Sequence, residues 1–322
     1  MRGQLTIGAR GSPLSLAQSQ QVADRLTALD PELTVTIKPI RTKGDDLAQK
    51  PQSLGLKGLF VQEIEAALLQ GRVDVAVHSA KDLPLELPPG LTLGPIPERG
   101  PVADVLVTLT GQTLTELPQR ARVGTSSARR AAQLLAVRPD AQVVPLRGNL
   151  DTRFQRLKAG QVDALILAEV GLRRLGRDQA WPWTRLAIDA FLPAPGQGAL
   201  ALEIRADDQR VLELLAPLNH PASALALALE RGVAEELGSG CQAPAAALAE
   251  LAEGLWFLQG LVAWPDGSTV ARAESRAQVN TLAAARAQGQ ALGRAILSQG
   301  GAAILADLAQ KNSSLSGEPR GR

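Results

Sequence analysis

The segment Gly124–Arg130 has the composition of an anion-binding turn. It reads Gly-Thr-Ser-Ser-Ala-Arg-Arg and stands where a short apolar run gives way to a helical pattern. Free backbone N–H groups, hydroxyls and the positive end of a helix dipole attract anions at such a turn. Two arginines in a first helical turn are unfavourable for the helix itself, which favours a bound anion that compensates them. The alternative is a serine-capped helix with solvated arginines, and the segment alone leaves both readings open.

Arginines recur at equivalent turns elsewhere in the chain. The planar guanidinium group pairs bidentately with carboxylates and phosphates. A single arginine is more often solvated surface than a ligand, but the recurrence predicts a bound molecule with several carboxylates or phosphates. The arginines, with one neighbouring serine, are Arg10 and Ser12, Arg129 and Arg130, Arg147 and Arg153, and Arg173 and Arg174.

A second candidate site follows the continuous apolar run Val73–Val77. The next residues, His78–Pro84, include Lys81 and Asp82. Because α/β sheets display their active groups at strand ends, Asp82 is a candidate for acid–base chemistry or for stabilising a cation. Lys81 would help to keep it ionised. The commoner meaning of such a dipeptide is a surface ion pair, and we expect His78 to be a packing residue rather than a catalyst.

Cys241 is the only cysteine of the chain. It stands in Gly240–Pro244, a stretch typical of a loop, where a thiol is accessible to reagents. A lone cysteine is more often a small buried side chain, and no flanking positive charge marks this one as reactive. One cysteine cannot form an internal disulfide, and with only two histidines the sequence predicts no metal site.

Composition argues against several classes of protein. The chain has 322 residues, of which 45% are hydrophobic, enough for the cores of two or three domains. No apolar run reaches the ~18 residues of a transmembrane helix. The first residues lack the apolar segment of a secretory signal, so we expect a cytoplasmic protein. The 34 basic and 32 acidic residues are balanced and only 2% of residues are aromatic, so we expect no nucleic-acid partner.

An imperfect internal duplication positions these candidate residues. Each copy predicts the order β-α-β-α-β, which is typical of an α/β lobe with a mostly parallel sheet and flanking helices. Ligands of such lobes bind at the carboxyl ends of the strands. The first copy comprises residues 5–7, 13–29, 33–40, 59–70 and 73–77, and the second comprises residues 121–123, 127–137, 141–146, 150–159 and 162–166.

A small α+β domain is predicted after the two lobes. It would contain a helix over 222–237, a hairpin of 255–264 with 268–274, and a helix over 278–298. Linkers rich in Pro and Gly are expected at 98–101, 193–198 and 217–221.

Eight segments resemble the porphobilinogen deaminase family, in the same order and along nearly the whole chain. Each is weak alone, but eight in register are specific. They are Ala9–Leu14, Lys57–Phe60, Val77–Pro84, Gly124–Arg130, Leu146–Arg153, Leu172–Gly176, Pro193–Ala199 and Gly240–Pro244.

The resemblance implies two periplasmic-binding-protein-like lobes with a small C-terminal domain. The first domain would span 1–98 and be completed by about 198–217, and the second would span 99–197. The third, for cofactor attachment, would span 218–311, followed by a disordered tail over 312–322. The linkers at 98–101 and 193–198 would then form a hinge.

The resemblance also implies the chemistry. In the family, four porphobilinogen molecules are condensed, with loss of ammonia, onto a dipyrromethane cofactor in thioether linkage to the cysteine that matches Cys241. Hydrolysis then releases the linear tetrapyrrole hydroxymethylbilane. Each pyrrole carries an acetate and a propionate, which requires several arginines, and the family's essential aspartate matches Asp82. We expect a monomer whose substrate is porphobilinogen and which has no membrane partner.

Two sets of binding residues follow from the same resemblance. Those implied for the cofactor are Ser79, Lys81, Thr125, Ser126, Ser127, Arg129, Arg130 and Arg153. Those implied for the substrate are Arg10, Ser12, Gln18, Lys57, Phe60, Arg147, Gly148, Arg174 and Gln197.

The chain departs from the family pattern at two places. Leu56 stands where the family usually has the second glycine of Gly-Gly-Lys-Gly, which weakens the implied mobility of that loop. After Glu98 and Arg99 the family commonly has an acidic-Pro-Arg-Asp stretch, whereas this chain has Gly100–Asp104 and therefore no arginine at 103.

Two other functions are alternatives to the one that the resemblance implies. A solute-binding protein with the same two lobes would bind a carboxylate or oxyanion, but the expected lack of a secretion signal, the third domain and the Lys81–Asp82 pair argue against it. An acyl transferase with Cys241 as nucleophile needs a nearby histidine. No recognisable motif supplies one, although His220 stays open as a spatial neighbour.

Overall fold

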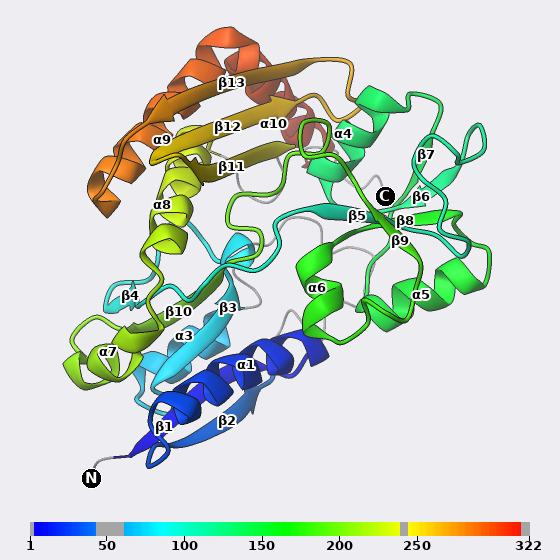
Figure 1. The fold of residues 1–322 in the computed structure, drawn as a ribbon. Helices are drawn as coiled ribbons and strands as arrows, with labels where there is room; N and C mark the ends of the chain where they lie inside the picture. Colours follow the sequence, from blue (N-terminus) through cyan, green and yellow to red (C-terminus); the bar gives the residue numbers. More distant parts are fainter. Residues whose placement is uncertain (1–2, 43–60, 239–243, 317–322) are drawn as a thin grey trace, which may run out of the picture.

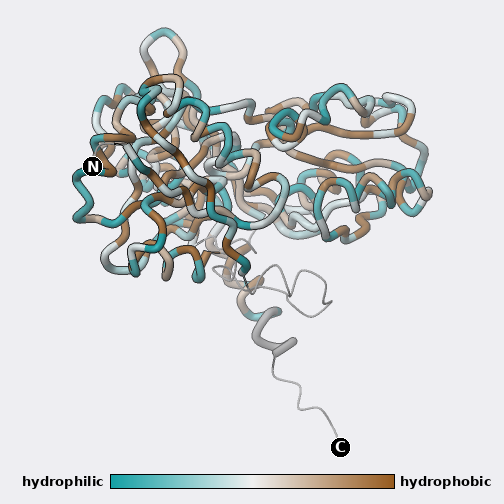
Figure 2. The backbone as a smooth tube through the Cα atoms, turned by 90° about the horizontal axis from the view of Figure 1, so that it is seen from below, coloured by the Kyte–Doolittle hydropathy of each residue, from teal (hydrophilic) through white to brown (hydrophobic). Residues whose placement is uncertain are grey.

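The computed structural model describes residues 3–42, 61–238 and 244–316. Within them the chain forms two lobes, each built on a five-stranded sheet, and a third domain with a three-stranded sheet (Figure 1). Figure 2 shows apolar stretches running through the interior of the lobes, with polar stretches along the outer loops and helices. The predicted class, two α/β lobes with a small C-terminal α+β domain, is confirmed.

Lobe 1 carries helices on both faces of its sheet. α1 begins where the sequence predicts, with Pro13 in its first turn and the Ser12 hydroxyl accepting the N–H of Ser15. α1 and α7 bury apolar side chains against one face, and α3 covers the other. The sheet order is β2-β1-β3-β10-β4. The elements are β1 (Gln4–Arg10), α1 (Pro13–Leu29), β2 (Thr34–Ile40), α3 (Gln62–Leu69), β3 (Val75–Ser79), η1 (Ala80–Asp82), β4 (Leu91–Leu93), β10 (Leu200–Arg205), α7 (Gln209–Leu215) and η2 (Ala216–Leu218).

Lobe 2 repeats this plan with the sheet order β7-β6-β8-β5-β9. α4 packs on one face of the sheet and α5 on the other, each through buried leucines. The elements are β5 (Asp104–Val107), β6 (Arg122–Gly124), α4 (Ala128–Val137), β7 (Gln142–Val144), α5 (Leu150–Lys158), β8 (Ala164–Ala168), α6 (Glu169–Arg174) and β9 (Trp183–Arg185).

One strand in each lobe runs against the others. β10 pairs antiparallel with β3 and β4, and β5 pairs antiparallel with β8 and β9, while β1 is parallel to β2 and β3 and β6 is parallel to β7 and β8. The sheets are therefore mostly parallel, as predicted. β10 follows lobe 2 in sequence but lies in the sheet of lobe 1, so the chain crosses between the lobes twice. The two crossings touch where the Gly100 N–H donates to the Gly198 carbonyl oxygen at 3.2 Å.

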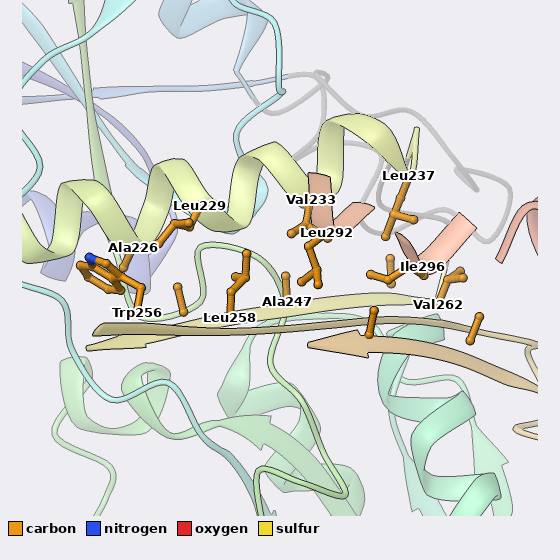
Figure 3. Close-up of a cluster of buried hydrophobic side chains, with 14 of the residues drawn as sticks. Ala226, Leu229, Val233, Leu237, Ala247, Trp256, Leu258, Val262, Leu292 and Ile296 are labelled. Atoms are coloured by element: carbon orange, nitrogen blue, oxygen red, sulfur yellow. The ribbon is translucent and has the colours of Figure 1, made fainter. Parts of the chain in front are cut away.

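The third domain packs its helices on one face of an antiparallel sheet. Figure 3 shows Leu229 and Val233 on the side of α8 that faces the sheet, where Ala247 and Leu258 are labelled. The opposite face packs on lobe 2 through a cluster that includes Ala132 and Leu192. The elements are α8 (Pro221–Glu236), β11 (Ala245–Ala252), β12 (Leu255–Ala263), β13 (Val270–Ala277), α9 (Leu282–Ile296), η3 (Leu297–Gly301) and α10 (Ala302–Ser316).

Helices α8 and α9 approach so closely that only glycine fits between them. A Cβ atom on Gly289 would lie 2.0 Å from the carbonyl oxygen of Leu229, and one on Gly232 would lie 2.3 Å from the carbonyl oxygen of Arg286. Both neighbours are backbone atoms of the facing helix, which cannot move aside alone. The two glycines therefore set the distance between these helices.

Several elements differ from the prediction. β11 is an alanine-rich strand, Ala-Ala-Ala-Leu-Ala-Glu-Leu-Ala, which local propensity does not mark as a strand; its pairing with β12 forms it. The helix predicted over 278–298 is followed, after η3, by α10, which extends to Ser316. Residues 312–316, predicted as the start of a disordered tail, are thus helical. No single described helix is long and apolar enough to cross a membrane, although the bent pair Gln209–Leu218 and Pro221–Glu236 passes on length and composition together.

Candidate functional site

The end of β3 presents the predicted Lys81 and Asp82. The buried strand ends at Ser79, and the 3₁₀ turn η1 that follows has Ala80 buried, Lys81 half-buried and Asp82 exposed. Ser79 is fixed by Gln18 of α1, whose Nε2 donates to the serine Oγ at 2.7 Å. The turn therefore rests on a rigid base while the Asp82 carboxylate faces solvent.

Gln197 connects this turn to lobe 2. Its Oε1 accepts a hydrogen bond from Lys81 Nζ at 3.2 Å, and its Nε2 donates to Asp104 Oδ1 at 2.9 Å and to the Val102 carbonyl oxygen at 2.7 Å. The Gln197 side chain is fully buried. A residue of the second crossing thus joins the end of β3 in lobe 1 to the start of β5 in lobe 2.

Asp104 holds both arginines of the Gly124–Arg130 turn. Arg129 Nη2 lies 2.8 Å from Asp104 Oδ2, and Arg130 Nη2 lies 2.7 Å from Asp104 Oδ1. Burial alone would raise the pKa of Asp104, but the Arg129 and Arg130 guanidinium groups hold it well below its usual range. Both arginines also donate to backbone carbonyls, at Leu192 and Ile166.

The structure combines parts of both interpretations of this turn. Ser127 does cap α4, accepting the Arg130 N–H at 3.4 Å, and the Ser126 hydroxyl donates to the Leu146 carbonyl oxygen at 2.8 Å. The arginines, however, are 5% and 7% exposed, so they are not solvated. One aspartate neutralises one of two guanidinium charges. The Nε groups of Arg129 and Arg130 are buried and have no hydrogen-bond partner among the described residues.

The positive charge extends along the neighbouring loop. Arg153 of α5 donates from Nε to the Gly148 carbonyl oxygen at 3.1 Å, where Gly148 has a left-handed φ of +104°. Burial first, and the charge of Arg130 second, lower the pKa of Arg153. Arg147 lies half-buried in the same loop. Arg130 and Arg153 therefore share one cationic region.

Lys81 belongs to the same electrostatic unit. Burial and then the Arg130 charge lower the pKa of Lys81 to about 8, while Asp82 and Asp104 act in the opposite direction. A bound carboxylate would favour the charged ammonium group and reverse this shift. We name the set Lys81, Asp104, Arg129, Arg130, Arg153 and Gln197 the interlobe cluster.

Other predicted residues lie outside this cluster. Arg10 ends β1, and its backbone N–H donates to Ser15 Oγ at 3.1 Å, next to the Ser12 cap of α1. Thr125 is buried after β6, and its N–H donates to the Val144 carbonyl oxygen. Arg174 ends α6 and donates to the Gly198 carbonyl oxygen at 2.8 Å. Three predicted residues, Lys57, Phe60 and Cys241, fall outside the described residues, as do residues 55–58.

Sequence reasoning missed three residues that organise the site. Besides Asp104, these are Arg99 and Glu230, which form a bidentate pair at 2.7 and 2.9 Å. Arg99 Nε donates to the Gln197 carbonyl oxygen, and the fully buried Glu230 also accepts the Gly196 and Ala249 N–H groups. The one available signal was Glu230 itself, a charge that directly follows the apolar run Ala224–Leu229 of helix α8. This pair fixes the second crossing to the third domain.

Comparison with known proteins places the chain in one family along nearly its whole length. The family model described as porphobilinogen deaminase, dipyromethane cofactor binding domain, matches residues 5–213, and the model of the C-terminal domain matches residues 224–298. The chain belongs to the porphobilinogen deaminase family. Porphobilinogen deaminase of Roseiflexus sp. is 47% identical over 95% of this chain and 100% of its own length. The Chromobacterium violaceum enzyme is 46% identical over 94% and 97%.

Membership of the porphobilinogen deaminase family gives the chain its activity class. It is a transferase with hydroxymethylbilane synthase function in tetrapyrrole biosynthesis, and its first two lobes form a dipyrromethane cofactor-binding unit. Among solved structures, a likeness of fold extends to the probable amino-acid ABC transporter binding protein YtmK of Bacillus subtilis, with a TM-score of 0.41 and 12% identity over 66% of this chain and 90% of that one. The VFT2 domain of Bordetella pertussis BvgS gives a TM-score of 0.38 and 19% identity over 66% and 84%.

Proposed function

We propose that the interlobe cluster binds the carboxylates of a dipyrromethane group attached through a thioether to Cys241. The observation that carries this is the charge balance: the cluster holds the cations Lys81, Arg129, Arg130 and Arg153 but a single carboxylate, Asp104, which pairs with Arg129 and Arg130. The unpartnered buried Nε groups of Arg129 and Arg130 are donors that a carboxylate would satisfy. The residues present therefore fit a polycarboxylate group, and the thiol serves as its anchor.

The bound dipyrromethane supplies the terminal pyrrole to which porphobilinogen is joined. We assign Asp82 the catalytic role because its carboxylate is exposed beside the cluster and lies at a strand end. When the C–N bond of the substrate breaks, ammonia leaves and a positive charge develops on the porphobilinogen ring. The Asp82 carboxylate accepts the hydrogen bond of the pyrrole N–H and stabilises that charge. The terminal pyrrole, when bound, would supply the ring carbon that forms the new C–C bond and loses a proton.

The other residues predicted from the sequence are proposed to bind the substrate or the cofactor. Arg10, Ser12, Gln18, Arg147, Gly148, Arg174 and Gln197 are assigned to the porphobilinogen side, with Lys57 and Phe60 outside the described residues. Ser79, Thr125, Ser126 and Ser127 are assigned to the cofactor side. In the structure Ser79 and Ser126 already engage Gln18 and the Leu146 carbonyl oxygen, so they support the site chiefly by orienting it.

The domain limits are likewise proposed as 1–98 with 198–217, 99–197 and 218–311. The pairing of β10 with β3 and β4 supports the return of the chain to the first domain. Four points stay predictions from the sequence. They are the addition of four porphobilinogen molecules in turn, the cytoplasmic location, the monomeric state, and the lack of nucleic-acid and membrane partners.

Turnover of porphobilinogen by Asp82→Asn tests the proposed chemistry. The amide keeps the size of the side chain but removes the negative charge, so we expect ammonia release to fall by at least ~100-fold with the fold intact. Glu86→Gln, another carboxylate of the same loop region, is the matched control and should keep wild-type activity. Near-normal turnover by Asp82→Asn would remove Asp82 from the proposed role.

A further inference from the structure

A second cationic pocket lies beside the crossings, apart from the contacts that define the interlobe cluster. It has a volume of about 350 Å³ and is lined by α1, by the first crossing at Gly100 and Pro101, and by α6. Lobe 1 contributes Arg25 and Gln21, and lobe 2 contributes Arg174. The pocket is thus shared by the two lobes at the point where the chain passes between them.

Some of the arginines that line this pocket are paired with carboxylates and others are not. Arg99 is paired with Glu230, and Arg173 is paired with Glu169 at 2.8 Å. Arg25 and Arg174 have no carboxylate partner among the described residues: Arg174 donates only to the Gly198 carbonyl oxygen. Glu98 also lines the pocket but is exposed and forms an ion pair with neither arginine.

Arg25 and Arg174 repel each other across the lobe boundary. Burial first, and the charge of Arg25 second, lower the pKa of Arg174 to about 10. Two like charges from different lobes disfavour close approach of those lobes unless an anion lies between them. Guanidinium groups bind oxyanions through pairs of N–H donors, and Gln21 adds an amide donor on the α1 side.

We propose that this pocket binds an oxyanion, a carboxylate or a phosphate, between Arg25 of lobe 1 and Arg174 of lobe 2. The bound anion cancels the repulsion and ties the lobes together beside Gly100 and Gly198. The oxyanion has two possible sources: a carboxylate of the substrate chain, or a free anion of the solution. Either source supplies the negatively charged oxygen atoms that the two guanidinium groups bind.

Titration of the cofactor-loaded protein with inorganic phosphate and with succinate tests the pocket itself. This arm of the test rests on the proposed function, in which the cofactor occupies the interlobe cluster, so that calorimetry measures the remaining site. We expect Arg25→Gln to raise the apparent Kd by about tenfold or more, the loss of one charge-assisted hydrogen bond. Arg25→Lys should retain part of the affinity. Arg156→Gln, an exposed arginine of α5, is the matched control and should bind as the wild type does.

The source of the anion is separated by a second measurement. Intact mass after a limiting addition of porphobilinogen gives the distribution of chain lengths on the enzyme. A distribution altered in Arg25→Gln and unchanged in Arg156→Gln supports a substrate carboxylate, and weakened phosphate binding with an unchanged distribution supports a free anion. Wild-type phosphate affinity together with a wild-type distribution in Arg25→Gln would overturn the proposal. The phosphate titration needs no turnover, so its result does not depend on the role assigned to Asp82.

Discussion

Replacing Asp104 with asparagine should destabilise lobe 2 by an amount far above that of a surface ion pair. The change leaves the side-chain size almost unaltered but leaves the two guanidinium groups of Arg129 and Arg130 without their shared carboxylate. Removing one partner of a buried ion pair costs about 3–5 kcal/mol because the remaining charge is buried without compensation. Here two such charges remain, so we expect a loss in that range.

The assay is urea unfolding of the cofactor-free protein followed by tryptophan fluorescence. Trp181 and Trp183 report on lobe 2, because Trp183 lies in β9 and Trp181 stacks on Phe154 of the lobe 2 core. Asp151→Asn is the control: it removes a pair with Arg177 whose side chains are 49% and 55% exposed, worth about 0–1 kcal/mol. Equal losses in the two variants would refute the reasoning.

Acid gives an independent check on the same carboxylate. The pKa of folded Asp104 lies below its ordinary value of 3.8, so the ionised form contributes stability above that pH. This contribution declines as the pH falls below about 3.8, and the difference between wild type and Asp104→Asn should narrow there. A difference in the free energy of unfolding between the two proteins that stays constant from pH 6 to about pH 3 would contradict the stabilising role of ionised Asp104.

Two further predictions concern packing and Lys81. Gly289→Ala should cost about 1–3 kcal/mol in the free energy of unfolding, because its Cβ would collide with the α8 backbone, whereas Gly171→Ala, with no atom within 4 Å of the added Cβ, should cost nothing measurable in urea titrations. Lys81 has a pKa of about 8 in the folded protein against 10.5 ordinarily, so between these values the unfolded chain binds the extra proton and stability rises with pH. Lys81→Met should remove that part of the rise in a pH series of unfolding midpoints; identical slopes would speak against it.

The sequence predicted the two lobes because their order of elements is encoded locally. Ser12 and Ser127 mark the starts of α1 and α4, and Gly160 marks the end of α5, each within a few residues of the observed limit. β10 and β11 were not predicted. β10 joins a sheet whose other strands come from the first hundred residues, and β11 depends on its partner β12 rather than on its alanines. Such long-range pairing leaves little trace in local composition.

The sequence predicted the cationic residues of the candidate site. The structure adds the Asp104 carboxylate that pairs with two of them. Repetition of arginines at strand ends pointed to Arg129, Arg130 and Arg153, and these do share one region. Asp104 entered the sequence analysis only as the last residue of the Gly100–Asp104 stretch and received no role there. It opens a short buried strand, and only the fold brings it 2.8 Å from Arg129. The pairing of Asp104 with the arginines of the Gly124–Arg130 turn can therefore be seen only in the three-dimensional structure.

The intact mass of the purified protein tests the central claim most directly. The account predicts that the wild-type chain carries an added mass of two pyrrole units and that Cys241→Ser carries none. The variant should also fail to release hydroxymethylbilane, while Ser239→Ala, a neighbour in the same segment, should keep the adduct. A fully active wild-type chain of unmodified mass, or an adduct that persists in Cys241→Ser, would contradict the account.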